Sequence, residues 1–178
     1  VGEDVQIVPS SKIARIRGLQ SHKNKIDTAF PGRRVAINLS GVSQEEISRG
    51  DVITHPGWLT GTQAVDAQLH ILKDSNVTLK HNMPVTFYSG SAEVLATVRL
   101  LDADEGLQDQ DVWVQLRLQR PTPLLNGDHF IVRSSSHTIG GGVIVEPHAK
   151  RHRRNHKATI ERLKILHSGS KEDIVIQI

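Results

Sequence analysis

The chain has 178 residues, a net charge of +3 and no cysteine. Its length allows one domain of ordinary size or two small ones. The lack of cysteine excludes disulfides, thiolate metal sites and cysteine nucleophiles, and it agrees with a cytoplasmic protein. No apolar run approaches the roughly 20 residues of a membrane-spanning helix, so we expect no membrane contact.

Short apolar runs alternate with turn signals along the chain, as in a β-sandwich or a β-barrel. Residues 64–71 and 112–119 alternate between apolar and polar side chains, which predicts strands with one face in a core and the other in water. One helical turn is predicted over residues 43–48. Strands are predicted over residues 5–8, 13–19, 34–39, 51–54, 62–71, 83–88, 92–101, 111–118, 129–133 and 138–145.

His55, Pro56 and Gly57 interrupt this pattern and mark the predicted domain boundary. Residues 1–57 hold too few strands to close a barrel, whereas residues 58–147 hold enough. The chain begins abruptly at Val1 and not at Met, so we expect that it starts inside a longer protein, after the first strands of that barrel. The predicted fold is mainly β, with two antiparallel β-barrels, the first partial, followed by a short basic helical segment at residues 148–178.

The basic charge is concentrated near the C-terminus. Residues 1–150 hold 15 Lys and Arg against 16 Asp and Glu, whereas residues 151–178 hold 7 against 3. Lys150, Arg151, Arg153 and Arg154 can meet the phosphate backbone of a nucleic acid, although a solvated basic linker is an equally good interpretation. Residues 158–166 have helical periodicity, and the apolar residues 174–178 are predicted to lead into a further domain.

Two sequence motifs would indicate a nucleotide-binding site, and each can be compared with this sequence. Asn24, Lys25 and Asp27 match the N-K-x-D pattern that reads guanine in GTPases, but no long buried strand precedes them and we reject the match. The phosphate-binding pattern G-x-x-x-x-G-K-[ST] does not occur in the sequence. We therefore expect neither a nucleotide cofactor nor catalytic activity in this chain.

Two further patterns have structural explanations. Residues 140–142 are three glycines without a following helix, so they predict a strand where side chains would collide rather than a phosphate loop. His148, His152 and His156 recur at intervals of four and would share one face of a helix. Neither carboxylate nor thiolate joins them and the surrounding charges are positive, so no metal site is expected.

The order of several motifs resembles the second and third domains of the EF-Tu-like translation GTPases. It is most similar to the selenocysteine-specific elongation factors of the SelB family. Residues 31–53 carry a turn, a buried strand, a spacer and a second turn. Residues 14–22 contain the pattern R-x-R-G-[IL]-Q-x-H, which begins at Arg15. Residues 85–94 and 127–144 resemble two strand pairs of the third domain.

The resemblance implies that the chain belongs to a protein that delivers selenocysteinyl-tRNA to the ribosome with GTP. Arg34 matches the position that faces the aminoacyl group, where a guanidinium complements the selenolate of selenocysteine. Its neighbour Arg33 is the competing candidate, and an exposed turn arginine is the simpler interpretation of both.

The resemblance also implies other tRNA contacts. Gln20, His22 and Lys23 align with positions near the 3′-terminal adenosine, and Arg49 aligns with an arginine that contacts the 5′ end. The family positions near the T-arm of the tRNA correspond to Arg133, His137 and Thr138.

The GTPase domain, with its GTP and Mg²⁺, and the region that reads an mRNA hairpin have no counterpart in this sequence. We expect them elsewhere in the parent protein. Three alternatives stay open: another translation GTPase, the GTP-binding subunit of a sulfate adenylyltransferase, and a β-barrel adaptor that binds protein.

Overall fold

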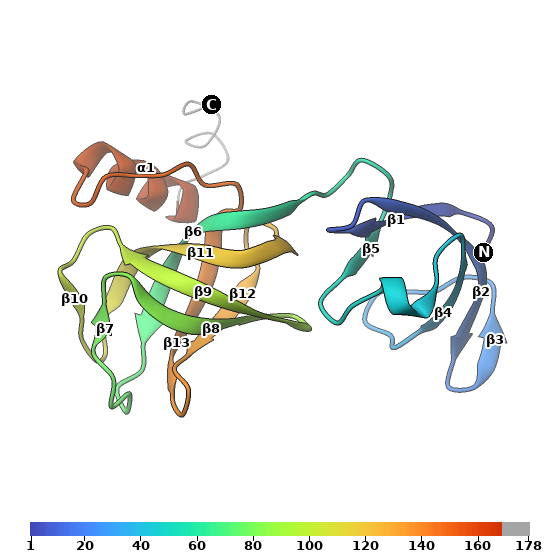
Figure 1. Ribbon diagram of the computed structural model, residues 1–178, viewed down its shortest axis with the longest axis horizontal. Coiled ribbons are helices and arrows are strands. Elements are labelled where there is room, and N and C mark those ends of the chain that lie inside the picture. The colour runs from blue at the N-terminus through green and yellow to red at the C-terminus, as the bar shows by residue number, and fades with distance from the viewer. Residues whose placement is uncertain (169–178) are drawn as a thin grey trace. The chain divides into compact units, whose positions relative to one another are not determined.

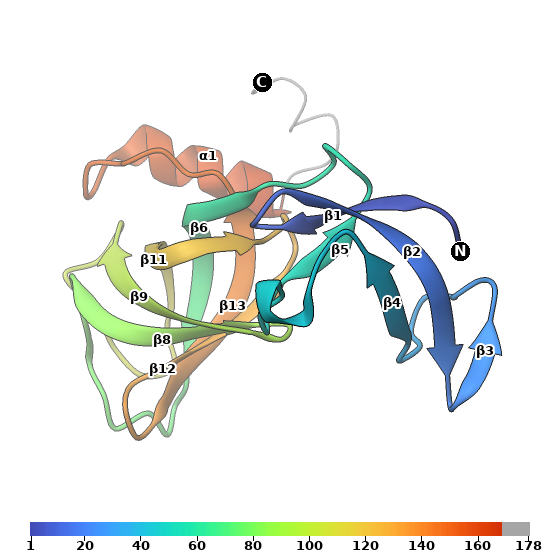
Figure 2. The same ribbon diagram turned by 45° about the vertical axis from the view of Figure 1, so that its right-hand side comes forward.

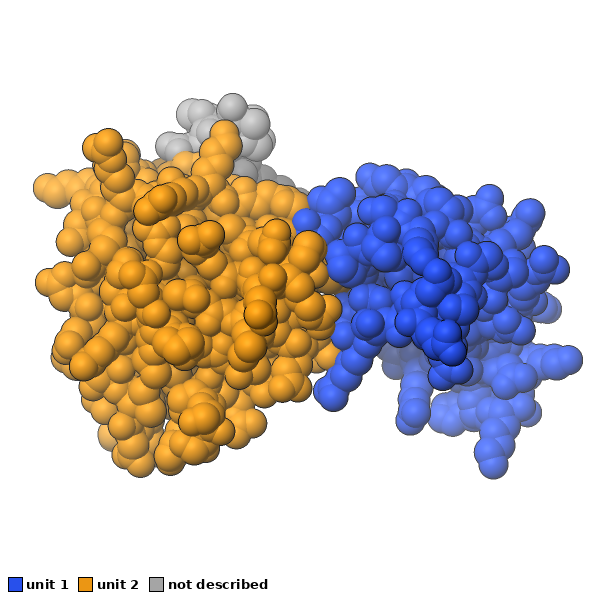
Figure 3. Space-filling view, in the orientation of Figure 1, with its two compact units in different colours: residues 1–61 blue, residues 62–178 orange. Residues whose placement is uncertain are grey.

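A computed structural model describes residues 1–168, which belong to two compact units, Val1–Gly61 and Thr62–Ile178. Figure 3 colours the two units separately. Strands dominate both units, so the mainly β fold is confirmed (Figure 1). The predicted boundary after Gly57 lies four residues before the observed division between Gly61 and Thr62. The apolar residues 174–178, predicted to enter a further domain, lie outside the described residues.

The first unit is an antiparallel sheet of five strands built around a long central one. The central strand β2 pairs along one edge with β1 and then β3, and along the other edge with β4. Within residues 1–61 no ladder joins β4 to β5, so the sheet stays open, as expected for an incomplete barrel. Its elements are β1 Asp4–Val8, β2 Lys12–Ser21, β3 Asn24–Ile26, β4 Ala36–Ser40, the 3-10 helix η1 Gln44–Glu46 and β5 Val52–Thr54.

The core of the first unit is small. Val5, Ile7 and Ala14 are its buried centre, and Ile16 and Leu39 pack against them. These side chains alternate along β1 and β2 and so share one face of the sheet. On β2 the opposite face carries the exposed side chains of Ile13, Arg15 and Arg17. The exposed face and the turns therefore hold the residues available for binding.

The second unit contains a closed antiparallel barrel of six strands, in the order β11-β6-β13-β12-β8-β9. Twenty buried residues fill it, including Phe87 and Phe130, whose rings stack with centroids 5.5 Å apart. Closure leaves the barrel without an unpaired edge. Its strands are β6 Gly61–Ile71, β8 Met83–Ser89, β9 Ala92–Leu100, β11 Asp111–Pro123, β12 His129–Arg133 and β13 Thr138–Glu146, with a small pair β7 Leu79–Lys80 and β10 Glu105–Gly106 beside them.

The predicted helix is present as α1, Lys157–Ser168, and it lies against the barrel (Figures 1 and 2). Leu163 is fully buried in a second cluster with Leu101, Trp113 and Val145. The basic residues that precede Lys157 are not helical. His148, His152 and His156 therefore do not share a helix face, and no cluster able to hold a metal ion occurs among residues 1–168.

The glycine triplet in β13 has the structural role that its sequence predicts. A Cβ at Gly140 would lie 2.1 Å from the carbonyl oxygen of His70, and one at Gly142 would lie 1.8 Å from that of Gln68. Real Cβ atoms do not approach backbone oxygens so closely. β6 and β13 can pair at this distance only because both positions lack a side chain.

We expect Gly142→Ala to destabilise the second unit by roughly 1–3 kcal/mol or more. The carbonyl oxygen of Gln68 belongs to the backbone and cannot move aside as a flexible side chain can. Urea unfolding followed by far-UV circular dichroism measures this change. Gly18→Ala is the control, since a Cβ there meets no atom within 4 Å. Equal stability of the two variants would contradict the close approach of β6 and β13.

Candidate nucleic-acid interface

The β2–β3 hairpin presents three of the predicted contact residues. Ser21 pairs with Asn24, so the turn consists of His22 and Lys23 alone. Both have positive φ, 50° and 67°, the backbone of a type I′ turn that follows the twist of the strands. Gln20 is exposed one residue before Ser21, and both turn side chains are exposed. All three therefore lie together at one end of the sheet.

Arg34 lies beside this hairpin. The hydroxyl of Ser21 donates a hydrogen bond of 3.3 Å to the Arg34 carbonyl, and Ala36 pairs with Gln20 where β4 begins. The backbone of Arg34 is thus held next to the hairpin while its side chain is exposed. The structure brings Arg34, Gln20, His22 and Lys23 together, next to a hollow of about 500 Å³ that Gln20 and Ala36 help to line.

Arg49 lies at the other end of the first unit. It belongs to a tight turn in which the Ser48 amide donates to the Asp51 carboxylate at 2.8 Å and the Asp51 amide donates to the Ser48 carbonyl at 3.1 Å. The strand that follows pairs Val52 with Val8, next to the β1–β2 turn. β2 rises about 3.3 Å per residue over its length, so up to roughly 30 Å separates this turn from the β2–β3 hairpin.

The predicted T-arm residues surround the β12–β13 turn of the second unit. Arg133 ends β12 and pairs with Thr138, the first residue of β13. The His137 amide donates to the Ser134 hydroxyl at 3.2 Å, which closes the turn. Arg133 and His137 are exposed and Thr138 is half-buried, so the structure places the three on one loop.

The basic segment before α1 is attached to the barrel. Gln115 donates through Nε2 to the Lys150 carbonyl at 2.8 Å, and Arg99 donates to the His152 carbonyl at 3.3 Å. Arg154 forms an ion pair with Asp104, with 2.7 Å between Nη2 and Oδ1. The segment is therefore held in place by the barrel and is not a free tail.

A buried carboxylate anchors this attachment. Asp66 is fully buried, and its oxygens lie 2.6 Å from Nε2 of His152 and 3.0 Å from Nε2 of Gln115. Burial raises the pKa of Asp66, and the adjacent His152 opposes that rise. The alternation along β6 predicts that Asp66 faces water. That prediction is wrong because residues 150–154 cover the outer face of the strand at this point.

Comparison with known proteins agrees with the arrangement of the second unit. Residues 65–151 match the family model of the beta-barrel domain of selenocysteine-specific elongation factors. This match covers the closed barrel from within β6 to the segment after β13. The resemblance drawn from the sequence motifs is therefore confirmed, and it favours this family over the three alternatives.

The likeness extends to the first unit. The chain is 36% identical over 178 residues, 99% of its length, to a selenocysteine-specific elongation factor of Desulfomicrobium baculatum. It spans 28% of the length of that relative. No helix within residues 1–168 is long and apolar enough to cross a membrane.

We expect His152→Ala to destabilise the second unit by roughly 3 kcal/mol, because the buried Asp66 carboxylate loses its closest partner. Urea unfolding followed by tryptophan fluorescence measures the change, because Trp113 is buried where α1 meets the barrel whereas Trp58 is already exposed. His129→Ala is the control, since His129 is exposed on β12. If both variants unfold at the same urea concentration, the contact between His152 and Asp66 does not stabilise the attachment.

Proposed function

We propose that this chain supplies tRNA-binding surfaces of a selenocysteine-specific elongation factor that delivers selenocysteinyl-tRNA to the ribosome. The observation that carries the proposal is the family match over residues 65–151, together with the 36% identity over 99% of the chain. The exposed polar and basic side chains on both units support it, because RNA is bound through phosphate contacts and through stacking on unpaired bases.

The chemistry of selenocysteine suits the position of Arg34. The selenol of selenocysteine ionises near neutral pH, whereas the side chain of serine on the precursor tRNA has no charge. A guanidinium on an anchored backbone can form charge-assisted hydrogen bonds to a selenolate and gains far less from a hydroxyl. Arg34 has such a backbone, held by Ser21, and an exposed side chain. It is the proposed specificity residue for the aminoacyl group.

The neighbours of Arg34 suit the end of the tRNA to which the amino acid is attached. The His22 imidazole can stack on the terminal adenine, and Gln20 can hydrogen-bond to a base edge. Lys23 can meet the adjoining phosphate. A tRNA held here can reach Arg49 with its 5′ end, provided that its acceptor end spans the distance along β2.

Two activities of the parent protein belong outside this chain in the proposal. The sequence lacks a phosphate loop, so binding and hydrolysis of GTP with Mg²⁺ are assigned to another domain. Recognition of an mRNA hairpin is assigned to another region as well. Within the second unit, Arg133, His137 and Thr138 are the proposed contacts to the T-arm.

We expect Arg34→Ala in the full-length parent protein to abolish the preference for selenocysteinyl-tRNA over seryl-tRNA. A hydrogen bond to a charged group contributes about 1.5–3 kcal/mol, so roughly a tenfold to hundredfold preference should be lost. Competition binding with the two aminoacylated forms of the same tRNA measures it.

Arg33→Ala is the matched control, since Arg33 is exposed in the same turn and carries the same charge. The control should lower the affinity for both tRNAs slightly and leave their ratio unchanged. An unchanged ratio in Arg34→Ala, or a lost ratio in Arg33→Ala, would contradict the role of Arg34.

A further inference from the structure

The turn between β11 and β12 contains the pair Asn126-Gly127, and asparagine precedes glycine nowhere else in the sequence. Asparagine is chemically labile, and a following glycine makes it more so, because glycine has no side chain to hinder ring closure. Both residues are exposed, so water reaches them. No binding role for Asn126 follows from the family resemblance.

The backbone of this turn is of type II. The Asp128 amide donates to the Leu125 carbonyl at 3.2 Å, which closes the four residues. Gly127 has a φ of 87°, whereas Asn126 is not among the described residues with positive φ, and this combination defines type II. A Cβ at Gly127 would meet no atom within 4 Å, so the backbone conformation is what requires glycine there.

The two nitrogen atoms that deamidation would use are both hydrogen-bonded to β13. The Gly127 amide, which would attack, donates to the Ile144 carbonyl at 2.8 Å. The side-chain amide of Asn126, which would leave, donates through Nδ2 to the Val145 carbonyl. The Ile144 amide in turn donates to the Asp128 carbonyl at 2.9 Å. The turn and β13 therefore hold each other in place.

Deamidation begins when the Gly127 nitrogen loses its proton and attacks Cγ of Asn126. A bond forms between that nitrogen and Cγ, the bond from Cγ to Nδ2 breaks, and ammonia leaves with the displaced proton. Water then opens the cyclic imide at either carbonyl, which gives aspartate or isoaspartate. The reaction needs neither cofactor nor oxidant, and hydroxide accelerates it by removing the first proton.

The folded turn opposes this reaction in two ways. The proton of the Gly127 amide is engaged by the Ile144 carbonyl, so the nitrogen is a poorer nucleophile. A type II turn also sets ψ of its first central residue at about +120°, which turns the Gly127 nitrogen away from the Asn126 side chain. Ring closure therefore requires that the turn separate from β13.

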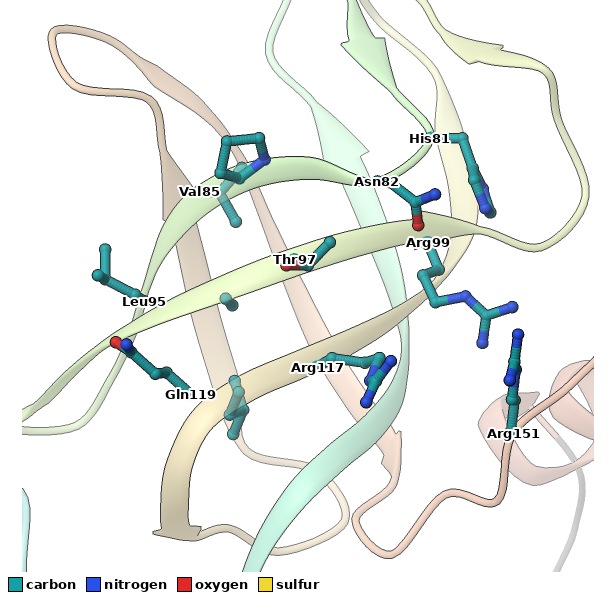
Figure 4. A pocket seen from close by; sticks show the side chains of 12 residues that line it. His81, Asn82, Val85, Leu95, Thr97, Arg99, Arg117, Gln119 and Arg151 are labelled. Carbon is teal, nitrogen blue, oxygen red and sulfur yellow. The ribbon is translucent and has the colours of Figure 1, made fainter.

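We propose that Asn126 is a deamidation site that the pairing of the turn with β13 keeps closed in the folded barrel, and that its modification weakens the barrel. The inference goes beyond the proposed function, because it involves neither tRNA nor the residues assigned to it. None of the four turn residues lines the hollow of about 650 Å³ over β8, β9 and β11, which Arg99 and Arg117 help to line (Figure 4).

The product of the reaction no longer fits the turn. An aspartate carboxylate has no N–H to donate, so the Val145 carbonyl loses this donor and faces a negative charge. The Asp128 carboxylate, which accepts from the Leu125 amide at 2.8 Å, is a second negative charge in the same turn. Isoaspartate also adds a methylene to the main chain, which displaces Gly127 from the position that the turn requires. A chain that deamidates while open therefore closes less well.

The test incubates the 178-residue chain in mildly alkaline buffer, folded in one sample and unfolded by guanidinium chloride in the other. Mass spectrometry of the peptide that contains Asn126 follows the conversion of its amide to a carboxyl. Reaction in the folded chain requires the loss of both hydrogen bonds to β13, so it should be roughly tenfold to hundredfold slower than in the unfolded chain. Asn126→Gln should abolish the rapid reaction in the unfolded sample.

Gly142→Ala tests whether β13 provides the protection. A Cβ at this position crowds the Gln68 carbonyl oxygen, so the pairing of β13 should open more often and deamidation in native buffer should accelerate several-fold. Gly18→Ala in the first unit is the matched control and should keep the wild-type rate. Circular dichroism checks folding before incubation. The comparison of folded and unfolded wild-type chain stands even if Gly142→Ala does not fold.

A second measurement examines the product. Asn126→Asp introduces the carboxylate directly, and urea unfolding followed by tryptophan fluorescence should show a roughly tenfold smaller folding equilibrium constant. Asn24→Asp is the control, since Asn24 is exposed in the first unit and undergoes the same change of charge.

Three results would overturn the inference. If folded and unfolded chains deamidate at the same rate, the contacts with β13 do not protect Asn126. If the unfolded chain converts Asn126 no faster than its other asparagines, the pair with Gly127 is not a labile site. If Asn126→Asp and Asn24→Asp unfold at the same urea concentration, the modification does not weaken the barrel.

Discussion

The candidate surface of the second unit depends on the contacts that the buried Asp66 carboxylate makes with His152 and Gln115. Asp66 joins strand β6 to His152 and, through Gln115, to β11. A carboxylate fully removed from water is stable only when its oxygens have partners, so the segment after the barrel must stay in place. That segment in turn delivers Arg151 to the barrel face and leads into α1, whose Leu163 packs beside Trp113.

Both units place their proposed binding residues outside the hydrophobic core, although the two cores differ in size. The closed barrel buries twenty residues, whereas the open sheet centres on three. In both, the residues proposed to meet RNA lie on turns or on the outer faces of strands, where they can contact a ligand without disturbing packing. The rigid scaffold fixes the backbone of these residues, and their side chains remain exposed.

The sequence predicts the long strands, α1 and the glycine triplet because each leaves a local pattern. It does not predict β3, β7 or β10, which are two or three residues long and have no period to read. β11 extends past its predicted end at residue 118 through Pro121 and Pro123, which usually mark strand ends. The family resemblance supplies Arg34 and Arg49, whereas Arg99 and Arg117 become neighbours only through the register of β9 and β11. Burial of Asp66 likewise depends on a segment more than 80 residues away, which no local pattern can reveal.

The turn of the β2–β3 hairpin has a consequence for the evolution of this protein. His22 and Lys23 both adopt positive φ, a conformation that glycine and asparagine occupy with less strain. A sequence selected only for stability would place Asn-Gly at this turn. The first unit, with its small core, instead keeps two strained residues whose side chains are proposed to contact RNA. Local instability at this point is thus compatible with selection for binding, and substitutions that stabilise the turn would remove the groups proposed to hold the tRNA end.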